Sequence, residues 1–287
     1  FRSGFSWGLL PVDPNQRYKL ADGQGNFVAD PWSRSYGYDA FGEFSLVPGT
    51  GAHLDRFFRV GQGGPLAGRT VRVHVPAEAP THVLYMHDGQ NLFNPGAIWG
   101  GWRLGESAPP AMLIVGIDNT PARMDEYTHV ADDLGGSVGG LGDHYAALVE
   151  EVVRPLIGVK YGEPAIAGTM GSSLGGLISL HIGHTYPDRY AFVGSMSGTL
   201  GWGSFGPHTF ETMIERYDAA GVLPFVVYLD SGGSGTCADT DGDGIEDDGD
   251  ASDNYCENNQ MRDVLAADGW TFGVDLHHWR SEERRVG

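Results

Sequence analysis

Short apolar runs alternate with helix-like stretches from residue 69 onward, and this alternation constrains the fold more than any other feature of the chain. The runs expected to form strands occupy residues 71–75, 81–86, 111–117, 165–169, 190–196, 225–229 and 271–279. The stretches expected to form helices occupy residues 145–159, 174–186, 209–220 and 258–267. Strands that alternate with helices favour a mostly parallel sheet covered on both faces. The sequence therefore predicts an α/β fold, a three-layer sandwich.

The first 53 residues follow a different pattern. Tryptophan, tyrosine and phenylalanine are spaced among glycine, proline, aspartate and asparagine without a helical period, which indicates short antiparallel strands and turns. The segments 18–20, 30–31 and 39–45 resemble the closing strands of the immunoglobulin-like early-set modules that precede carbohydrate-active enzymes and some esterases. We therefore expect residues 1–53 to be the remnant of a β-sandwich module. Its aromatic residues are expected to pack against the next domain, with sugar binding as the alternative.

The composition limits the class of protein and its partners. With 287 residues and 41% hydrophobic content, the chain can bury one large core, or one core and a small module. No apolar run approaches membrane-spanning length, so a soluble globular protein is expected. The formal net charge of -19 argues against nucleic acid and anionic membrane as partners, because the field repels phosphate.

The two cysteines of the chain bracket one acidic insertion, residues 237–256. Between Cys237 and Cys256 lie eight acidic side chains in an irregular segment. A disulfide is expected here, with two unrelated thiols as the alternative, and it requires an oxidising compartment. We therefore expect a secreted or periplasmic protein. Phe1 is not an initiator residue, so the natural amino terminus, and any signal peptide, is expected to be missing from this sequence.

The acidic insertion has the spacing of a calcium-binding loop. Aspartates occupy positions 1, 3, 5, 9 and 12 of a twelve-residue segment that has glycine at position 6. Hard cations bind several oxygens at once, and the glycine permits the sharp turn that brings them together. The expected ligands are the carboxylates of Asp239, Asp241, Asp243, Asp247 and Asp250, and the backbone carbonyl of Ile245. The segment resembles the calcium repeats of thrombospondin type 3. A structural Ca²⁺ is predicted, and a solvated acidic loop is the alternative.

A glycine-flanked serine stands where a strand meets a helix. The pentapeptide 171–175 (Gly-Ser-Ser-Leu-Gly) lies between the strand-like run 164–170 and the helix-like stretch 174–186. A serine hydroxyl becomes an effective nucleophile when a sharp strand-to-helix turn exposes it beside a base, and glycines allow that turn. We therefore expect Ser173 to be the nucleophile of such an elbow, with a glycine-rich turn as the alternative.

Two further catalytic parts are expected on either side of this elbow. The segment 85–91 (Tyr-Met-His-Asp-Gly-Gln-Asn) follows a buried strand, so the backbone N–H of Gly89 or Gln90 can stabilise an oxyanion together with that of Leu174. Asp230 ends the run 225–229, which places its carboxylate at the edge of the sheet where ligands bind in such folds. There it could orient a catalytic histidine. The alternatives are a plain strand-to-helix turn for the first segment and a cap or turn aspartate for Asp230.

Together these segments resemble the putative esterase family, the α/β hydrolases that include feruloyl esterases, esterase D and siderophore esterases. The matching segments are residues 85–93, 116–118, 123–127, 171–176, 195–198 and 228–232. The resemblance covers residues 54–279, the expected catalytic domain. It implies an α/β-hydrolase fold and hydrolysis of carboxylic esters through an acyl-serine, without a cofactor for catalysis. It also implies Ser173 as nucleophile and Asp230 as acid.

Three residues are expected on the rim of this site. Arg123 belongs to the segment 123–127, which the resemblance places at the rim, and His87 and Asp88 precede the oxyanion donors. The alternative for Arg123 is a surface ion pair of little value to stability. The alternative for His87 and Asp88 is a local pair within a turn.

The histidine is where the chain departs from the family pattern. The family carries it in the loop after the last strand, whereas Trp279 is followed by Arg280-Ser-Glu-Glu-Arg-Arg-Val-Gly287, without histidine. The same eight residues are encoded by a common sequencing adapter, so residues 280–287 are expected to be an artefactual tail. His277 or His278 could replace the missing base, and His278 is the candidate retained. Neighbouring strand residues face opposite ways, however, and both precede the loop in question.

Three functions remain open from the sequence. The first is an exported, calcium-stabilised serine esterase that acts on a small-molecule or sugar-linked ester, for which Trp99, Trp102 and Trp202 would offer aromatic contacts. The second is an acyltransferase that uses the same Ser173 and Asp230. The third is a catalytically impaired secreted protein that binds carbohydrate or another ligand.

Overall fold

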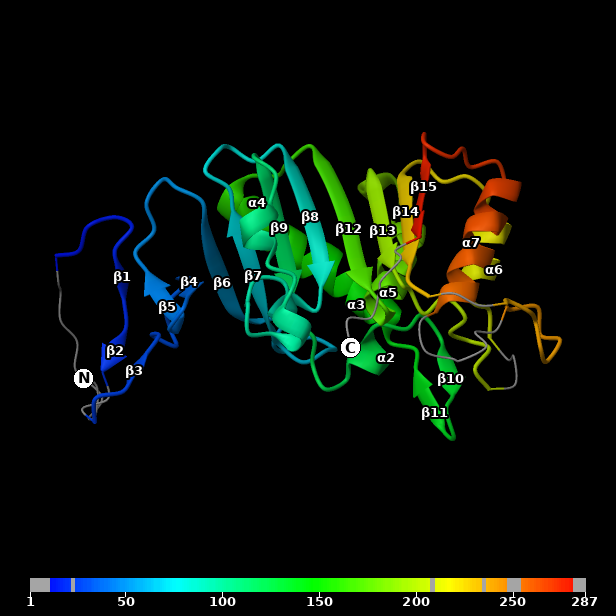
Figure 1. Ribbon diagram of the computed structural model, residues 1–287, viewed down its shortest axis with the longest axis horizontal. Helices are drawn as coiled ribbons and strands as arrows, with labels where there is room; N and C mark the ends of the chain where they lie inside the picture. Colours follow the sequence, from blue (N-terminus) through cyan, green and yellow to red (C-terminus); the bar gives the residue numbers. More distant parts are fainter. Residues whose placement is uncertain (1–10, 22–23, 207–209, 234–235, 247–253, 281–287) are drawn as a thin grey trace.

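The computed structural model describes residues 11–21, 24–206, 210–233, 236–246 and 254–280. Within them, one eleven-stranded sheet runs through the molecule in the order β1-β5-β4-β6-β7-β9-β8-β12-β13-β14-β15 (Figure 1). The site expected from the sequence lies in the second half of this order, where the strands are parallel.

The parallel strands confirm the alternation seen in the sequence. They are β9 (Met112–Ile117), β8 (His82–His87), β12 (Ile166–Ser172), β13 (Phe192–Met196), β14 (Val226–Ser231) and β15 (Leu276–Arg280). The last strand is shorter than expected, because the carbonyl of Thr271 accepts the amides of Asp275 and Leu276 and closes a turn before it.

The remaining strands are antiparallel. In the main sheet they are β1 (Arg17–Tyr18), β5 (Gly42–Leu46), β4 (Ser35–Asp39), β6 (His53–Val60) and β7 (Arg69–Val75). Two small hairpins stand apart, formed by β2 (Leu20–Ala21) with β3 (Phe27–Val28), and by β10 (Ala131–Asp133) with β11 (Ser137–Gly139). The short amino-terminal strands therefore continue the main sheet through β6. The domain boundary at residue 53 stays a prediction.

The helices follow the strands as the alternation predicts. They are α1 (Leu104–Ser107), α2 (Arg123–Glu126), α3 (Gly142–Leu148), α4 (Arg154–Tyr161), α5 (Leu174–Thr185), α6 (Met213–Ala220) and α7 (Tyr255–Ala267). The helix expected over 145–159 consists of α3, a π-helical turn at Val149–Val153 and α4. Among the described residues, no helix has the length and apolar content to cross a bilayer.

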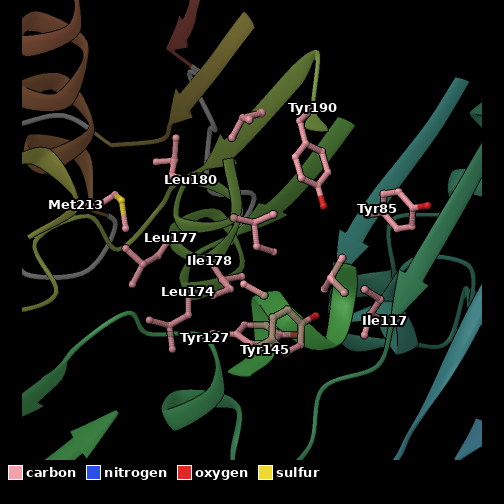
Figure 2. Packing of buried hydrophobic residues seen from close by; sticks show 14 of the residues in the cluster. Tyr85, Ile117, Tyr127, Tyr145, Leu174, Leu177, Ile178, Leu180, Tyr190 and Met213 are labelled. Carbon is pink, nitrogen blue, oxygen red and sulfur yellow. The ribbon is translucent and has the colours of Figure 1, made fainter. Parts of the chain in front are cut away.

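The two faces of the sheet are buried unequally. Val83, Tyr85 and Val115 point into the large core formed with α3 to α7, whereas Met86 and Ile114 point into a smaller cluster on the other face. Right-handed crossovers explain this division. The chain passes from β8 to β9 in one direction across the sheet, and from β9 to β12 and the later strands in the opposite direction, so the two kinds of crossover cover opposite faces. In Figure 2, Leu174, Leu177 and Ile178 of α5 pack beside Tyr127 and Tyr145. The α/β fold is thus confirmed.

Candidate active site

Ser173 occupies a strained turn between β12 and α5. Its backbone has φ 59° and ψ −127°, a region that residues other than glycine rarely adopt. The Ser173 amide donates to the carbonyl of Met196 at 2.9 Å, and the Ser173 carbonyl accepts the amides of Gly176 and Leu177. Such conformations persist only when their surroundings fix them. The local geometry is that of a nucleophile elbow.

Close contacts with neighbouring segments explain two glycines of the elbow. A Cβ atom on Gly171 would lie 2.5 Å from the carbonyl oxygen of Gly175. A Cβ atom on Gly176 would lie 2.4 Å from Oγ of Ser195, in β13. The close approach of β12, α5 and β13 therefore requires glycine at positions 171 and 176.

The expected oxyanion loop lies directly beside the elbow. It begins at Asp88 (φ 57°, ψ 45°) and forms the 3₁₀ turn η1 (Gly89–Asn91). A Cβ on Gly175 would lie 3.4 Å from Oδ2 of Asp88, so this loop contacts the first turn of α5. In the described part of the chain, no acceptor is found for the amides of Gln90 and Leu174. Both groups can therefore donate to a ligand, and their oxyanion role remains a prediction.

Asp88 and Arg123, which are expected on the rim from the sequence, form an ion pair that joins three segments. Nε and Nη2 of Arg123 donate to the two carboxylate oxygens of Asp88, each at 2.8 Å. Asn119 Nδ2 donates to the same carboxylate at 2.6 Å. The Asp88 amide donates to the hydroxyl of Tyr127 at 3.2 Å, and Nη2 of Arg123 reaches the carbonyl of Ser172 at 3.4 Å. The pair thus connects the oxyanion loop, α2 and the elbow.

His87 does not lie on the rim, which corrects the expectation from the sequence. Its side chain is 2% exposed, with Nδ1 2.9 Å from the hydroxyl of Tyr145 and Nε2 3.2 Å from Oγ1 of Thr169. Burial lowers the pKa of His87 to about 3, so the ring is neutral near pH 7. The physical reason is strand alternation, because His87 faces the same way as Tyr85, into the large core.

Asp230 stands at the same edge of the sheet as Ser173. Met196 is paired with Ser172 on one side and with Asp230 on the other. Since neighbouring strands lie about 4.8 Å apart, the Cα atoms of Ser172 and Asp230 are about 10 Å apart. Oδ2 of Asp230 accepts a hydrogen bond from the Tyr228 hydroxyl at 3.1 Å. Burial, with the Asp230 charge second, raises the pKa of Tyr228 to about 12.

The structure does not bring His278 to Asp230. In the pairing of β14 with β15, His278 lies opposite Leu229, which is fully buried under the helices, while His277 lies opposite Tyr228. Side chains paired in register share a face, so His277 is on the side of Asp230 and His278 is on the side of α7. Burial, followed by the charge of Arg262, lowers the pKa of His278.

Sequence reasoning missed one neighbour of Ser173, the residue Thr199. Its Oγ1 lies 3.4 Å from Oγ of Ser173, and its side chain is 9% exposed. Thr199 follows the segment 195–198, which was recognised in the sequence without a role. The signal available was that this segment leaves β13 at the edge where the elbow stands.

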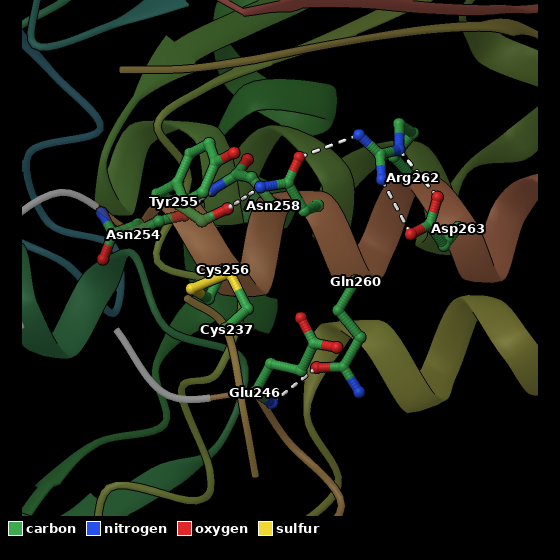
Figure 3. The surroundings of a disulfide bond; sticks show 10 residues. Cys237, Glu246, Asn254, Tyr255, Cys256, Asn258, Gln260, Arg262 and Asp263 are labelled. Atoms are coloured by element: carbon green, nitrogen blue, oxygen red, sulfur yellow. Dashed lines mark hydrogen bonds and ion pairs between the residues drawn. A yellow bond between two sulfur atoms is a disulfide. The ribbon is translucent and has the colours of Figure 1, made fainter. Parts of the chain in front are cut away.

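The described residues 237–246 of the acidic insertion contact α7. The disulfide Cys237–Cys256 is present, which confirms that expectation (Figure 3). Gln260 Nε2 donates to the carbonyl of Gly244 at 2.7 Å, and its Oε1 accepts the amide of Glu246 at 2.8 Å. Ile245 is 5% exposed and belongs to the large core.

Three of the expected calcium ligands gather within this insertion. One carboxylate oxygen from each of Asp239, Asp241 and Asp243 lies within 4.8 Å of the others. Asp239 also accepts the backbone amides of Gly242, Asp243 and Gly244, which fold the segment around its carboxylate. A carboxylate oxygen with one such bond retains a lone pair for a cation. Asp247 and Asp250 lie outside the described residues.

Comparison with known proteins agrees with this geometry. A family model described as "Putative esterase" matches residues 67–244. A Bacillus subtilis protein, named uncharacterized protein YbbA, is 32% identical over 123 residues, which cover 40% of this chain and 49% of that protein. The chain thus spans about half the length of this curated relative.

Several solved structures share the fold. An IroE-like serine hydrolase from Shewanella oneidensis has a TM-score of 0.59 at 17% identity, over 79% of this chain and 72% of that one. Enterochelin esterase from Shigella flexneri has a TM-score of 0.55 at 17% identity, over 88% of this chain and 63% of that one. Siderophore hydrolase EstA from Aspergillus nidulans has a TM-score of 0.57 at 16% identity, over 79% and 86%.

Proposed function

The chain belongs to the putative esterase family, and we propose that it hydrolyses carboxylic esters through an acyl intermediate on Ser173. The observation that carries this proposal is the strained backbone of Ser173 at the junction of β12 and α5. Asp230 at the same sheet edge and the oxyanion loop beside α5 support it.

The proposed reaction divides the work among these groups. Oγ of Ser173 attacks the ester carbonyl carbon, and the amides of Gln90 or Gly89 and of Leu174 donate to the oxygen that becomes negative. A general base takes the serine proton and gives it to the leaving alcohol, and water then hydrolyses the acyl-serine. Asp230 would orient a histidine base. Among the described residues, no histidine is hydrogen-bonded to Ser173, so we assign that base to none of them.

Two experiments test this function together. The protein is incubated with p-nitrophenyl acetate and butyrate to detect hydrolysis, and with an alkyl fluorophosphonate, which modifies activated serines. We expect release of p-nitrophenol and a single phosphonate adduct on the peptide that contains Ser173. The absence of both hydrolysis and labelling would refute the proposal. It would favour the binding protein considered from the sequence. Acyl transfer to an added alcohol in preference to water would instead identify an acyltransferase.

The substrate proposal is a small-molecule or sugar-linked ester. Of the tryptophans considered, Trp202 is only 2% exposed and donates from Nε1 to the carbonyl of Val130, so it packs instead of binding substrate. Trp99 is 95% exposed and Trp102 is 38% exposed. The amide of Trp102 donates to the carbonyl of Asn91, at the end of the oxyanion loop. We therefore propose that Trp99 and Trp102 are the aromatic residues that contact the substrate.

We propose in addition that the acidic insertion holds a structural Ca²⁺ through the carboxylates of Asp239, Asp241, Asp243, Asp247 and Asp250 and the carbonyl of Ile245. The grouped carboxylates support this assignment. The ion would order the insertion, which contacts α7, and would take no part in catalysis. The disulfide supports an exported protein, in the periplasm or outside the cell.

Removing calcium is expected to lower the melting temperature. An ion present at a hundred times its Kd stabilises the folded state by about 2.7 kcal/mol, which is roughly 5–10 °C for a protein of this size. Differential scanning fluorimetry with EGTA, then with added Ca²⁺ or Mg²⁺, measures the shift. Limited proteolysis should show faster cleavage within residues 237–256 without Ca²⁺. Asp241→Ala removes an oxygen ligand and should abolish the Ca²⁺ response, whereas Asp263→Ala on α7 should retain it. The same melting temperature and cleavage in EGTA and Ca²⁺ would contradict the site.

A further inference from the structure

A short chain of polar side chains leads from α7 to the candidate nucleophile. Nδ2 of Asn254 lies 3.4 Å from Oγ1 of Thr199, which lies 3.4 Å from Oγ of Ser173. The same Nδ2 donates to the carbonyl of Ser197 at 2.8 Å. Asn254 is the N-cap residue of α7, and Thr199 lies in the loop after β13. Three segments that are distant in sequence therefore meet at one hydroxyl group.

The direction of the hydrogen bonds follows from the chemistry of the groups. A carbonyl oxygen only accepts, so the Asn254 atom that faces Ser197 must be the amide nitrogen, and this fixes the orientation of the side chain. An amide nitrogen only donates, so it gives its second hydrogen to Oγ1 of Thr199. The hydrogen of the Thr199 hydroxyl is then free to point at Ser173. With Thr199 as the donor to Ser173, donation runs from Asn254 to Thr199 to Ser173.

We propose that Thr199 is a catalytic residue that donates to Oγ of Ser173, and that Asn254 is a positioning residue that orients Thr199. Ser173 accepts this bond, so its own hydrogen is directed away from Thr199 and toward the general base. As the proton leaves, negative charge develops on Oγ and the bond from Thr199 becomes charge-assisted and stronger. The inference rests on the proposed function, because it assigns roles around the same nucleophile.

The surroundings of Asn254 are rigid enough for a positioning role. Asn258 is fully buried, and its Nδ2 donates to the carbonyl of Gly198 at 2.8 Å and to that of Asn254 at 2.6 Å. The buried carboxylate of Glu257 accepts the amide of Gly201. The disulfide at Cys256 ties the same helical turn to the acidic insertion (Figure 3). These contacts thus hold the first turn of α7 against residues 197–201, which include Thr199.

The size of the expected effect follows from the strength of one hydrogen bond in the transition state. Both contacts are long in the free protein, at 3.4 Å, but catalytic hydrogen bonds tighten in the transition state, where losing one of ordinary strength lowers the rate about ten-fold. We therefore expect Thr199→Val and Asn254→Ala to lower kcat about ten-fold while KM stays within about two-fold. Thr199→Ser retains the donor and should stay within about three-fold of the wild type.

The experiment compares these variants with a matched control on the same helix. Asn259→Ala removes a side chain that donates to the carbonyl of Tyr255 and accepts from Arg262, so we expect it to leave kcat unchanged. For each variant we would measure p-nitrophenyl acetate hydrolysis, the rate of fluorophosphonate labelling and the melting temperature. Labelling should slow in Thr199→Val and Asn254→Ala and recover in Thr199→Ser. All rates are taken at least 15 °C below the lowest melting temperature, so that only folded protein reacts.

The outcomes separate this inference from the function on which it rests. If the wild type is labelled on Ser173 and both Thr199→Val and Asn254→Ala react at its rate, the donor chain is refuted and the esterase proposal stands. If labelling slows in every variant, Asn259→Ala included, in proportion to its loss of melting temperature, the residues have only a structural role. The inference is then also refuted. A wild type that is neither active nor labelled refutes both proposals.

Discussion

Ser173→Ala is expected to reduce kcat for ester hydrolysis by roughly 10⁴- to 10⁶-fold, because without Oγ no acyl intermediate can form. The remaining activity would come from the oxyanion donors and from substrate binding alone. The melting temperature should barely change, since alanine meets the same backbone strain at φ 59° as serine does. Steady-state hydrolysis of p-nitrophenyl acetate measures the loss, and fluorophosphonate labelling should disappear with it.

The neighbouring serine provides the control for this prediction. Ser172 ends β12, one residue before the turn. Its backbone carbonyl accepts a hydrogen bond from Arg123. Ser172→Ala keeps that carbonyl and should remain within about three-fold of wild-type kcat, because among the described residues the half-buried Ser172 hydroxyl has no hydrogen bond to lose. If Ser172→Ala lost activity and Ser173→Ala kept it, the elbow would be assigned to the wrong residue.

Glu126→Ala is expected to lower the free energy of unfolding by roughly 3–5 kcal/mol, because it leaves a buried charge without its partner. The side chains of Arg69 and Glu126 are only 1% and 2% exposed. Nη1 and Nη2 of Arg69 donate to the two carboxylate oxygens at 2.8 and 2.9 Å, and the hydroxyl of Thr120 donates to one of them at 3.0 Å. Urea denaturation followed by tryptophan fluorescence gives the change in free energy.

An exposed pair in the same protein is the matched control. Arg103 and Glu106 are in contact at 2.8 Å, but their side chains are 57% and 64% exposed. Glu106→Ala should therefore cost less than about 1 kcal/mol. A double replacement, Arg69→Met with Glu126→Leu, should recover much of the lost stability because it removes both charges. Equal losses for Glu126→Ala and Glu106→Ala would contradict the importance of burial.

The Arg69–Glu126 pair also bears on the candidate site. Glu126 ends α2, the short helix that begins with Arg123, and Arg123 binds Asp88 of the oxyanion loop. A four-residue helix has almost no stability of its own, so its position depends on such tertiary contacts. Glu126→Ala should therefore loosen the oxyanion loop and lower kcat as well as stability.

Local patterns in the sequence were sufficient for the framework of the site. The apolar runs placed β8, β12 and β14, and the glycines around Ser173 indicated the turn that the structure contains. The cysteines that bracket the insertion indicated the disulfide. These features depend on residues close together in the chain, so their physical causes can be seen in the sequence.

His87 and His278 show where sequence reasoning reached its limit. His87 was selected because it precedes the oxyanion donors, and His278 because the loop after the last strand lacks a histidine. Alternation along the strand then decided which face each side chain would occupy. The side of the sheet that the helices cover depends on the handedness and order of the crossovers, which the sequence pattern did not reveal. His87 therefore lies in the core, and His278 faces α7.

By itself, the sequence determined the α/β framework, the elbow at Ser173, the acidic insertion and its disulfide, because each arises from short-range periodicity or spacing. The tertiary structure alone decided which distant residues meet: Arg69 with Glu126, Arg123 with Asp88, and Asn254 with Thr199 beside Ser173. These pairs depend on strand order and register, which bring together side chains from separate parts of the chain. No local pattern encodes such a contact, since each partner is an ordinary polar residue until the fold brings it to the other.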